Sequence, residues 1–462
     1  MKLFLYLCKY EKNKFCDDSC DLSVKRILAA FLLIIATSGA KAQTFLESVY
    51  LSVDKGMEAV YAKGDTIRVF AETDRERPAV LKLFLNGKPQ SENEVLLKAG
   101  RTEVFRVASD EAVALMFQLA DKENRKDSTR VGAIVAPEDF RPGFEEPADF
   151  REFWEEQLRP LREQKMMRAK LTPVKVPGED ADKYRCYDLE IMVPLPGVRP
   201  ARGYLALPKK AKKHSLPIAI YAHSAGPLTA SYTKSSIQRA VSLAKRGGGA
   251  IALDINAHGI LNGQDDAYYE AMEIELNGYA YWPVTGHEKF YFRGMFLRLV
   301  SALDYLCCLK EWDGKRVLVT GGSQGGAQCA ALAGLDPRVT MVVVDVPALW
   351  DTGAILKGRA SRLERWGVDT YAKEILPYYD ACNFLRYYKG DLVVNVGLID
   401  DICPPANVWA TFNVCPAKSK VIHPCAWKAH SGRYSIPDRE ARSRLRHQMD
   451  RYQSADIDSF LR

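Results

Sequence analysis

The feature that most constrains this sequence is an aliphatic run that ends in a glycine-rich turn and resumes as small residues. Residues 317–319 lead into Gly321-Gly-Ser-Gln-Gly325, and small or apolar residues then recur at helical spacing as far as Leu335. This order predicts a strand, a sharp turn and a helix. In a G-x-S-x-G elbow, the strained turn holds the serine hydroxyl clear of the sheet. Ser323 is therefore a candidate nucleophile, although a glycine-rich turn with an incidental serine gives the same pattern.

Length and charge narrow the class of protein. The 462 residues allow two to three domains, and a hydrophobic content of 47% is enough for a large core. The formal net charge of +7 is spread along the chain and forms no basic arm, so we expect no nucleic-acid partner.

The N-terminus has the order of a signal peptide. Lys25-Arg26 precede an apolar run at 27–36, and small residues follow as far as Ala40-Lys-Ala42. We expect residues 1–42 to be removed and the mature protein to be exported, either to the periplasm or out of the cell. A membrane anchor is the alternative, but the apolar run is about half the length of a spanning helix, so no span is expected in the mature chain.

Residues 43–136 are predicted to form a separate β-domain. Short alternating runs such as 66–71 and 79–85 read as strands, and the second ends at Asn86-Gly87, a dipeptide typical of hairpins. Strands without helices over about 90 residues indicate a β-sandwich of immunoglobulin-like size. We interpret it as a packing module in preference to a carbohydrate-binding module, because it holds no candidate catalytic cluster.

Residues 137–462 are predicted to form an α/β domain. A proline-rich, acidic linker at 137–147 precedes an amphipathic helix at 149–158. Apolar strands then alternate with helical segments; the strands are expected at 216–222, 250–254, 317–320, 340–345 and 392–396. Strands that are apolar on both faces indicate a mostly parallel sheet that is covered on both sides.

Three reactive side chains follow strands of this predicted sheet. Ser323, Asp400 and His430 each lie beyond a strand, where parallel sheets bind ligands. A serine hydroxyl needs an imidazole to take its proton and a carboxylate to orient that imidazole. The chain order Ser, Asp, His is that of α/β-hydrolases.

Two of these positions have competitors. His423 falls within a strand-like segment whereas His430 lies in a loop, so His430 is preferred. Asp400 and Asp401 are adjacent, and their spacing does not separate them.

The oxyanion site is predicted from two backbone N–H groups. One belongs to Gln324, directly after the nucleophile, and the other to Ala225 in the loop Tyr221-Ala-His-Ser-Ala-Gly226. His223 is expected to shape this loop through hydrogen bonds.

Other reactive or aromatic residues receive structural interpretations. The eight cysteines beyond the leader have no metal-binding spacing and are expected to be mostly buried free thiols, so we predict no metal site and no cofactor. Four tryptophans could stack on sugars, but each is interpreted as a core residue in preference; they are Trp350, Trp366, Trp409 and Trp427.

Ordered motifs across residues 137–462 carry a resemblance to a known family. They include Pro147-Ala-Asp-Phe-Arg-Glu-Phe-Trp154, Phe290-Tyr-Phe-Arg-Gly294, Val319-Thr-Gly-Gly-Ser-Gln-Gly-Gly326, Leu335-Asp-Pro-Arg-Val339 and Gly397-Leu-Ile-Asp400. The set resembles the acetyl xylan esterases and cephalosporin-C deacetylases of carbohydrate esterase family seven. That resemblance implies a triad of Ser323, Asp400 and His430, and it favours Asp400 over Asp401.

The sequence departs from the family's pattern in two places. The family's R-G-Q motif is not kept: the corresponding run is Asp254-Ile-Asn-Ala-His-Gly-Ile-Leu-Asn-Gly263, so the packing of that arginine must be supplied differently. The G-H-E motif reads Ala429-His-Ser431 and lacks the glutamate. Simple members lack the N-terminal domain and form ring-like hexamers. An added domain could block that assembly, so a homo-oligomer is left open.

The resemblance implies an exported serine esterase that removes O-acetyl groups from carbohydrates such as acetylated xylo-oligosaccharides. A small acetyl ester is the other expected substrate. Two alternatives remain open: an α/β-hydrolase acting on another bond, such as a peptidase or a dienelactone-type hydrolase, and a non-catalytic carbohydrate-binding protein.

Overall fold

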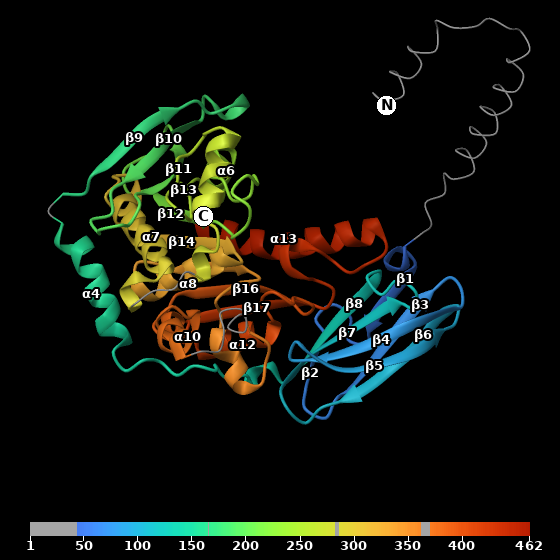
Figure 1. The fold of residues 1–462 in the computed structure, drawn as a ribbon. Coiled ribbons are helices and arrows are strands. Elements are labelled where there is room, and N and C mark those ends of the chain that lie inside the picture. The colour runs from blue at the N-terminus through green and yellow to red at the C-terminus, as the bar shows by residue number, and fades with distance from the viewer. Residues whose placement is uncertain (1–43, 165, 282–285, 362–369) are drawn as a thin grey trace, which may run out of the picture. The chain divides into compact units, whose positions relative to one another are not determined.

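Two sheets of mostly antiparallel strands open the fold (Figure 1). The computed structural model describes residues 44–164, 166–281, 286–361 and 370–462, so the predicted leader lies outside the described residues. The first sheet has the strand order β1 (Val49–Val53), β3 (Thr66–Thr73) and β6 (Gly100–Ala108). The second has the order β2 (Val60–Tyr61), β8 (Ser128–Val135), β7 (Val113–Asp121), β4 (Arg77–Leu85) and β5 (Lys88–Leu97).

Alternation and turn chemistry explain these strands. Buried and non-buried residues alternate along β3, as a strand with one covered face requires. Asn86 and Gly87, which join β4 to β5, have φ angles of 53° and 81°. A two-residue hairpin turn with both φ angles positive matches the twist of its strands, so the predicted hairpin is confirmed. The immunoglobulin-like class of this β-domain stays a prediction.

The second half of the chain forms a nine-stranded sheet. Its order is β17 (Ser419–Cys425), β16 (Asp391–Gly397), β15 (Met341–Asp345), β14 (Trp312–Gly322), β12 (Leu216–Ala222), β13 (Ile251–Ile255), β11 (Ala201–Pro208), β10 (Tyr184–Ile191) and β9 (Ala169–Val174). The strands from β17 to β13 run parallel, and β11, β10 and β9 pair antiparallel. The predicted mostly parallel sheet is confirmed.

Helices cover both faces of this sheet. Val317 and Val319 of β14 pack into one core with α7 (Tyr291–Cys307) and α8 (Gln324–Leu335), whereas Leu318 belongs to the other core. That second core is closed by α5 (Ile237–Ala244) and the end of α13 (Arg439–Leu461). Because successive side chains point to opposite faces, a strand covered on both sides must be continuously apolar.

The remaining helices are α3 (Phe45–Ser48), α4 (Phe150–Glu163), α6 (Asp266–Glu275), α10 (Thr370–Ile375), α11 (Ala381–Leu385) and α12 (Pro405–Val414). The predicted helix at 149–158 continues to Glu163 through Pro160, because Leu161 is buried and extends its apolar face. Across the described helices, none combines the length and apolarity that crossing a bilayer requires.

The described tryptophans and cysteines mostly lie in the core. Trp350, Trp409 and Trp427 are buried, while Trp366 falls outside the described residues. The cysteines from Cys186 to Cys425 are all free and six of the eight are buried, which confirms the interpretation as apolar thiols.

Candidate active site

Ser323 lies in a strained elbow between β14 and α8. Its φ and ψ angles are 50° and −120°, a region that residues with a side chain rarely adopt. The turn is held from β15, because the Ser323 N–H donates to Asp345 O at 2.9 Å. The Ala348 N–H donates in turn to Ser323 O at 2.8 Å. The predicted strand, sharp turn and helix are confirmed.

Glycines let β12 pass close to this elbow. A Cβ atom on Gly321 would lie 2.6 Å from Ala222 O, and one on Gly325 would collide with the same carbonyl. Since that carbonyl belongs to the central sheet, it cannot move aside.

Gly325→Ala should therefore lower the free energy of unfolding by about 1 to 3 kcal/mol, as overpacking of a filled interior does. Chemical denaturation would measure the change. Gly248→Ala is the matched control, because a Cβ atom there meets nothing within 4 Å. Equal stability of the two variants would contradict the steric role of Gly325.

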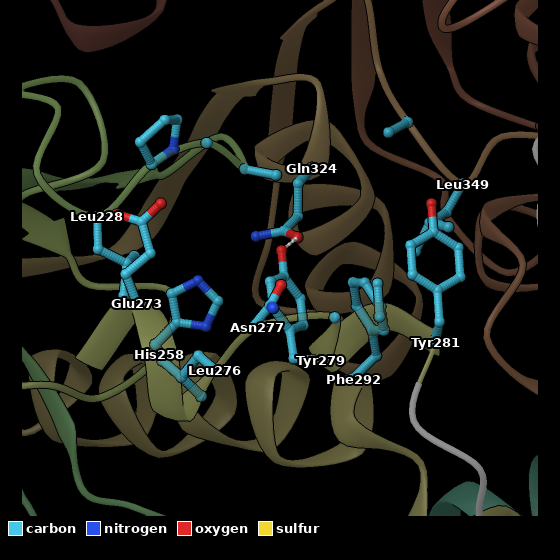
Figure 2. A pocket seen from close by; sticks show the side chains of 16 residues that line it. Leu228, His258, Glu273, Leu276, Asn277, Tyr279, Tyr281, Phe292, Gln324 and Leu349 are labelled. Carbon is cyan, nitrogen blue, oxygen red and sulfur yellow. Dashed lines mark hydrogen bonds between the residues drawn. The ribbon is translucent and has the colours of Figure 1, made fainter. Parts of the chain in front are cut away.

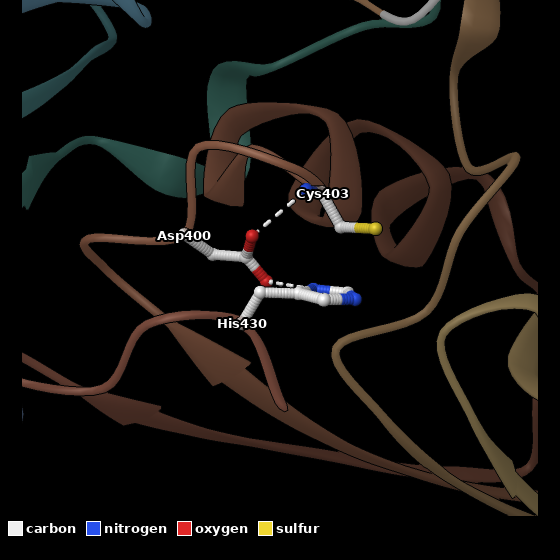
Figure 3. Close-up of side chains that lie close together, drawn as sticks. All are labelled: Asp400, Cys403 and His430. Carbon is white, nitrogen blue, oxygen red and sulfur yellow. Dashed lines mark hydrogen bonds and ion pairs between the residues drawn. The ribbon is translucent and has the colours of Figure 1, made fainter. Parts of the chain in front are cut away.

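The structure brings the three predicted side chains together. His430 Nε2 lies 3.0 Å from Ser323 Oγ. His430 Nδ1 lies 2.9 Å from Asp400 Oδ2, as Figure 3 shows. A carboxylate can only accept, so Nδ1 carries the proton and Nε2 is left to accept the serine hydroxyl. Ser323 and Asp400 are buried, and the His430 side chain keeps 17% of its surface exposed. The arrangement can take a proton from Ser323.

Backbone donors hold the Asp400 carboxylate in place. The N–H groups of Ile402 and Cys403 donate to Asp400 Oδ1 at 2.9 and 2.8 Å, which leaves Oδ2 for His430. The neighbouring Asp401 points elsewhere, since its side chain is 57% exposed and pairs with Arg130.

The competing histidine lies away from this arrangement. His423 is within β17, as expected, and its ring stacks on Tyr452 with centroids 4.8 Å apart.

The same acidic turn could in principle hold a metal ion. Ligand atoms of Asp400, Cys403 and His430 lie within 4.8 Å of one another (Figure 3). However, both imidazole nitrogens already face Asp400 and Ser323, so a metal bound there would displace one of them. The donor set fits a proton-transfer site better than a metal centre.

The loop that carries Ala225 is anchored on three sides. Gln328 Nε2 of α8 donates to His223 O at 2.9 Å, and Ser224 Oγ donates to Gly322 O at 2.9 Å. The ring of His223 faces Tyr232 O at 3.0 Å and the Asp254 carboxylate. Both ring nitrogens thus face acceptors, which matches the expected structural role of His223 and bars it from acting as the base.

A small apolar pocket adjoins the elbow (Figure 2). Its volume is about 270 Å³, and its wall includes Ala225, Gln324 and Ala348. The pocket therefore lies beside both predicted oxyanion donors. Apolar and aromatic side chains form much of the rest, among them Leu228, Leu276, Tyr279, Phe292 and Leu349. The Tyr279 hydroxyl donates to the side-chain oxygen of Gln324 and so holds that residue (Figure 2).

The histidine in the pocket wall, His258, is not a competing base. Burial lowers the pKa of His258 to about 3, so its ring is neutral at ordinary pH. His258 Nδ1 lies 2.8 Å from the Tyr291 hydroxyl. This residue shapes the pocket wall.

Comparison with known proteins identifies the family of this chain. The acetyl xylan esterase (AXE1) family profile matches residues 137–437. The chain belongs to the acetyl xylan esterase family. It is 32% identical over 348 residues to the acetyl esterase Axe7A of Xylanibacter ruminicola, an alignment that covers 72% of this chain and 75% of that protein. As a member of this family, the protein is an esterase.

Solved structures with the same fold include two acetyl xylan esterases. The enzyme from Paenibacillus sp. R4 has a TM-score of 0.54 at 22% identity, covering 69% of this chain and 98% of that one. Acetyl xylan esterase 1 from Thermoanaerobacterium sp. JW/SL YS485 has a TM-score of 0.50 at 24% identity, covering 69% and 97%. The α/β-hydrolase fold follows from both.

Two arginines hold the loop that stands where the family has its R-G-Q motif. Arg298 of α7 donates through Nη2 to Ala257 O at 2.6 Å, and Arg202 of β11 donates through Nη1 to Gly259 O at 2.7 Å. Arginines of α7 and β11 therefore hold this loop through hydrogen bonds to its backbone carbonyl oxygens.

The sequence did not predict one buried contact beside the site. Lys428, two residues before His430, is buried and pairs with the Asp345 carboxylate. Asp345 O also accepts from Ser323 N–H, so this residue ties the histidine loop to the elbow. Nothing in the spacing of Asp345 and Lys428 signals the pair, since the burial of Lys428 becomes known only from the structure.

Proposed function

We propose that this protein is an exported carbohydrate deacetylase that works through a Ser-His-Asp triad and an acetyl-enzyme intermediate. Its substrates are acetylated xylo-oligosaccharides and small acetyl esters. The observation that carries the proposal is the chain of contacts from Asp400 through His430 to Ser323, beside a pocket with both oxyanion donors. Export rests on the leader sequence at residues 1–42.

The first half of the reaction forms the acetyl-enzyme. His430 Nε2 takes the proton from Ser323 Oγ as that oxygen attacks the acetyl carbonyl carbon. The carbonyl oxygen becomes an oxyanion, which accepts hydrogen bonds from the N–H groups of Gln324 and Ala225. His430 then gives its proton to the sugar oxygen as the bond between that oxygen and the carbonyl carbon breaks. The sugar leaves with its hydroxyl restored.

The second half releases acetate. His430 takes a proton from water, the resulting hydroxide oxygen attacks the acetyl carbon, and the same N–H groups stabilise the second oxyanion. The bond to Ser323 Oγ breaks, and His430 returns the proton to that oxygen. Asp400 keeps the imidazole in one tautomer and stabilises its positive charge in both halves.

The small pocket supports selectivity for short acyl groups. A volume of about 270 Å³ with apolar walls has room for a methyl group and part of a sugar, and Glu273 is the one charged side chain among the described residues that line it. A longer acyl chain would compete with the sugar for this space.

A panel of esters and amides tests the proposal. We expect acetate release from acetylated xylo-oligosaccharides and 4-nitrophenyl acetate, with kcat/KM falling at least about 10-fold for the butyrate ester and no cleavage of aminoacyl amides. Acetylated glycans of other sugars, run beside the xylan fragments, identify the preferred substrate. Amide cleavage faster than deacetylation would overturn the assignment in favour of a peptidase.

A further inference from the structure

The histidine loop is a short hairpin whose base rests on the β-domain. Lys428 and Tyr434 form an antiparallel bridge, Ala429 N–H donates to Arg433 O, and His430 lies at the tip. At the base, Trp427 Nε1–H donates to Leu51 O of β1 at 2.7 Å. The hairpin that presents the base of the reaction is therefore bonded to a strand about 380 positions earlier in the chain.

Strand β8 bonds to both sides of the same hairpin. Gly132 N–H donates to Ala426 O at 2.8 Å on one side. On the other side, Arg130 N–H donates to Ser435 Oγ at 2.7 Å, and that hydroxyl also lies 3.1 Å from Thr129 Oγ1. A third segment of the β-domain joins in, since Ala426 N–H donates to Met57 O at 2.8 Å.

The same strand lies against the acid turn. A Cβ atom on Gly132 would collide with Leu398 O and lie 2.5 Å from Leu398 Cβ, so β8 approaches to backbone contact two residues before Asp400. Arg130, on the same face of β8, also pairs with Asp401 one residue after it, a contact that adds little to the clamp because the Asp401 side chain is mostly exposed. Leu398 N–H donates to Cys425 O at 3.0 Å, which joins the acid turn to the start of the hairpin.

We infer that the β-domain is a positioning element for catalysis: β1 and β8 clamp the His430 hairpin and the Asp400 turn against each other and so set their approach to Ser323. This inference rests on the proposed triad. Ser323 is fixed by the central sheet through β14 and β15, whereas Asp400 and His430 lie in irregular segments beyond β16 and β17. Such segments move more easily than sheet strands unless other contacts hold them.

Two features separate a clamp from ordinary domain packing. The contacts are made largely by backbone groups and short side chains, which transmit position with little slack. The contacts lie within five residues of Asp400 and of His430, both before and after each of them in the sequence. A shift of about 1 Å in such a constellation can reduce turnover about 100-fold without touching the substrate.

Gly132→Ala tests the clamp directly, because the added methyl wedges β8 away from Leu398. We expect kcat for 4-nitrophenyl acetate to fall about 10- to 100-fold while KM changes less than about threefold, since none of the clamp residues lines the pocket in which the substrate is proposed to bind. Val131→Ala is the matched control: its side chain is buried, neighbours Gly132 on β8 and points to the opposite face. It should lower the melting temperature yet keep kcat within about twofold.

A milder pair of variants covers the case in which Gly132→Ala fails to fold. Ser435→Ala removes the hydroxyl that bonds to Thr129 and Arg130, and kcat should fall several-fold, about 3- to 10-fold. Ser435→Thr keeps the hydroxyl and should restore most of the rate.

Labelling of Ser323 is a second readout, and it separates failure of the clamp from failure of the proposed substrate. The rate at which a fluorophosphonate labels Ser323 needs an aligned His430 but no sugar, and it should fall in parallel with kcat in the clamp variants. If wild-type protein is labelled but releases no acetate, the proposed substrate is wrong and the clamp is judged by labelling alone. If Gly132→Ala and Ser435→Ala lose no more kcat or labelling rate than Val131→Ala, the clamp is overturned.

Discussion

Ser323→Ala should lower kcat/KM for an acetyl ester by about 10⁴- to 10⁶-fold, equivalent to about 6 to 8 kcal/mol in the barrier. The reason is chemical: without Oγ no acetyl-enzyme forms, and what remains is water attack assisted by the oxyanion site. Acetate release under saturating and limiting substrate measures the loss. Retention of more than about one-tenth of wild-type turnover would rule out Ser323 as the nucleophile.

Ser301→Ala is a suitable control for this experiment. Ser301 is fully buried in α7, and its hydroxyl has no hydrogen-bond partner among the described residues. Its removal should leave kcat/KM unchanged within about twofold and stability nearly unchanged, because no bond is lost. A loss of activity in both variants would point to a fault in folding and not in chemistry.

Asp400→Asn should reduce kcat by about 10³- to 10⁴-fold with little change in fold. An amide at this position is nearly isosteric and can still accept from the Cys403 N–H, but it cannot balance a positive imidazole charge. Its NH₂ group can also turn toward Nδ1 and force the proton onto Nε2, which blocks acceptance from Ser323. Steady-state kinetics and a melting curve together distinguish this chemical effect from unfolding.

Asp401→Asn provides the adjacent comparison. Its carboxylate is mostly exposed and pairs only with Arg130 among the described residues, and exposed ion pairs contribute about 0 to 1 kcal/mol. We expect kcat within about twofold of wild type. If Asp401→Asn were the more damaging change, the assignment of the acid would have to move by one residue.

The elbow and the sheet were predictable because their signals are local. Residues 317–335 form one continuous stretch with an aliphatic strand, glycines that the close approach of β12 requires, and a helix of small residues. Alternation in β3 and the Asn86-Gly87 turn carry the same kind of signal in the β-domain. Each depends only on neighbours along the chain, so each leaves a readable pattern.

Local sequence patterns do not distinguish Asp400 from Asp401 as the acid. The two side chains point in different directions. The N–H groups of Ile402 and Cys403 hold Asp400, and Arg130 of β8 pairs with Asp401. The resemblance to a family favoured Asp400, and the geometry places its carboxylate 2.9 Å from His430. The spacing of residues along the sequence predicts neither the contacts of Asp400 nor those of Asp401.

By itself, the sequence determined the kind of sheet, the strained serine turn and the order of the three reactive side chains. Only the tertiary structure decided that His430 comes within 3.0 Å of Ser323, that Lys428 reaches Asp345, and that β8 lies against Leu398. The physical reason is the range of the interactions. Periodicity and turn chemistry act over a few residues, whereas these contacts join segments about 80 to 270 residues apart, which no local pattern encodes.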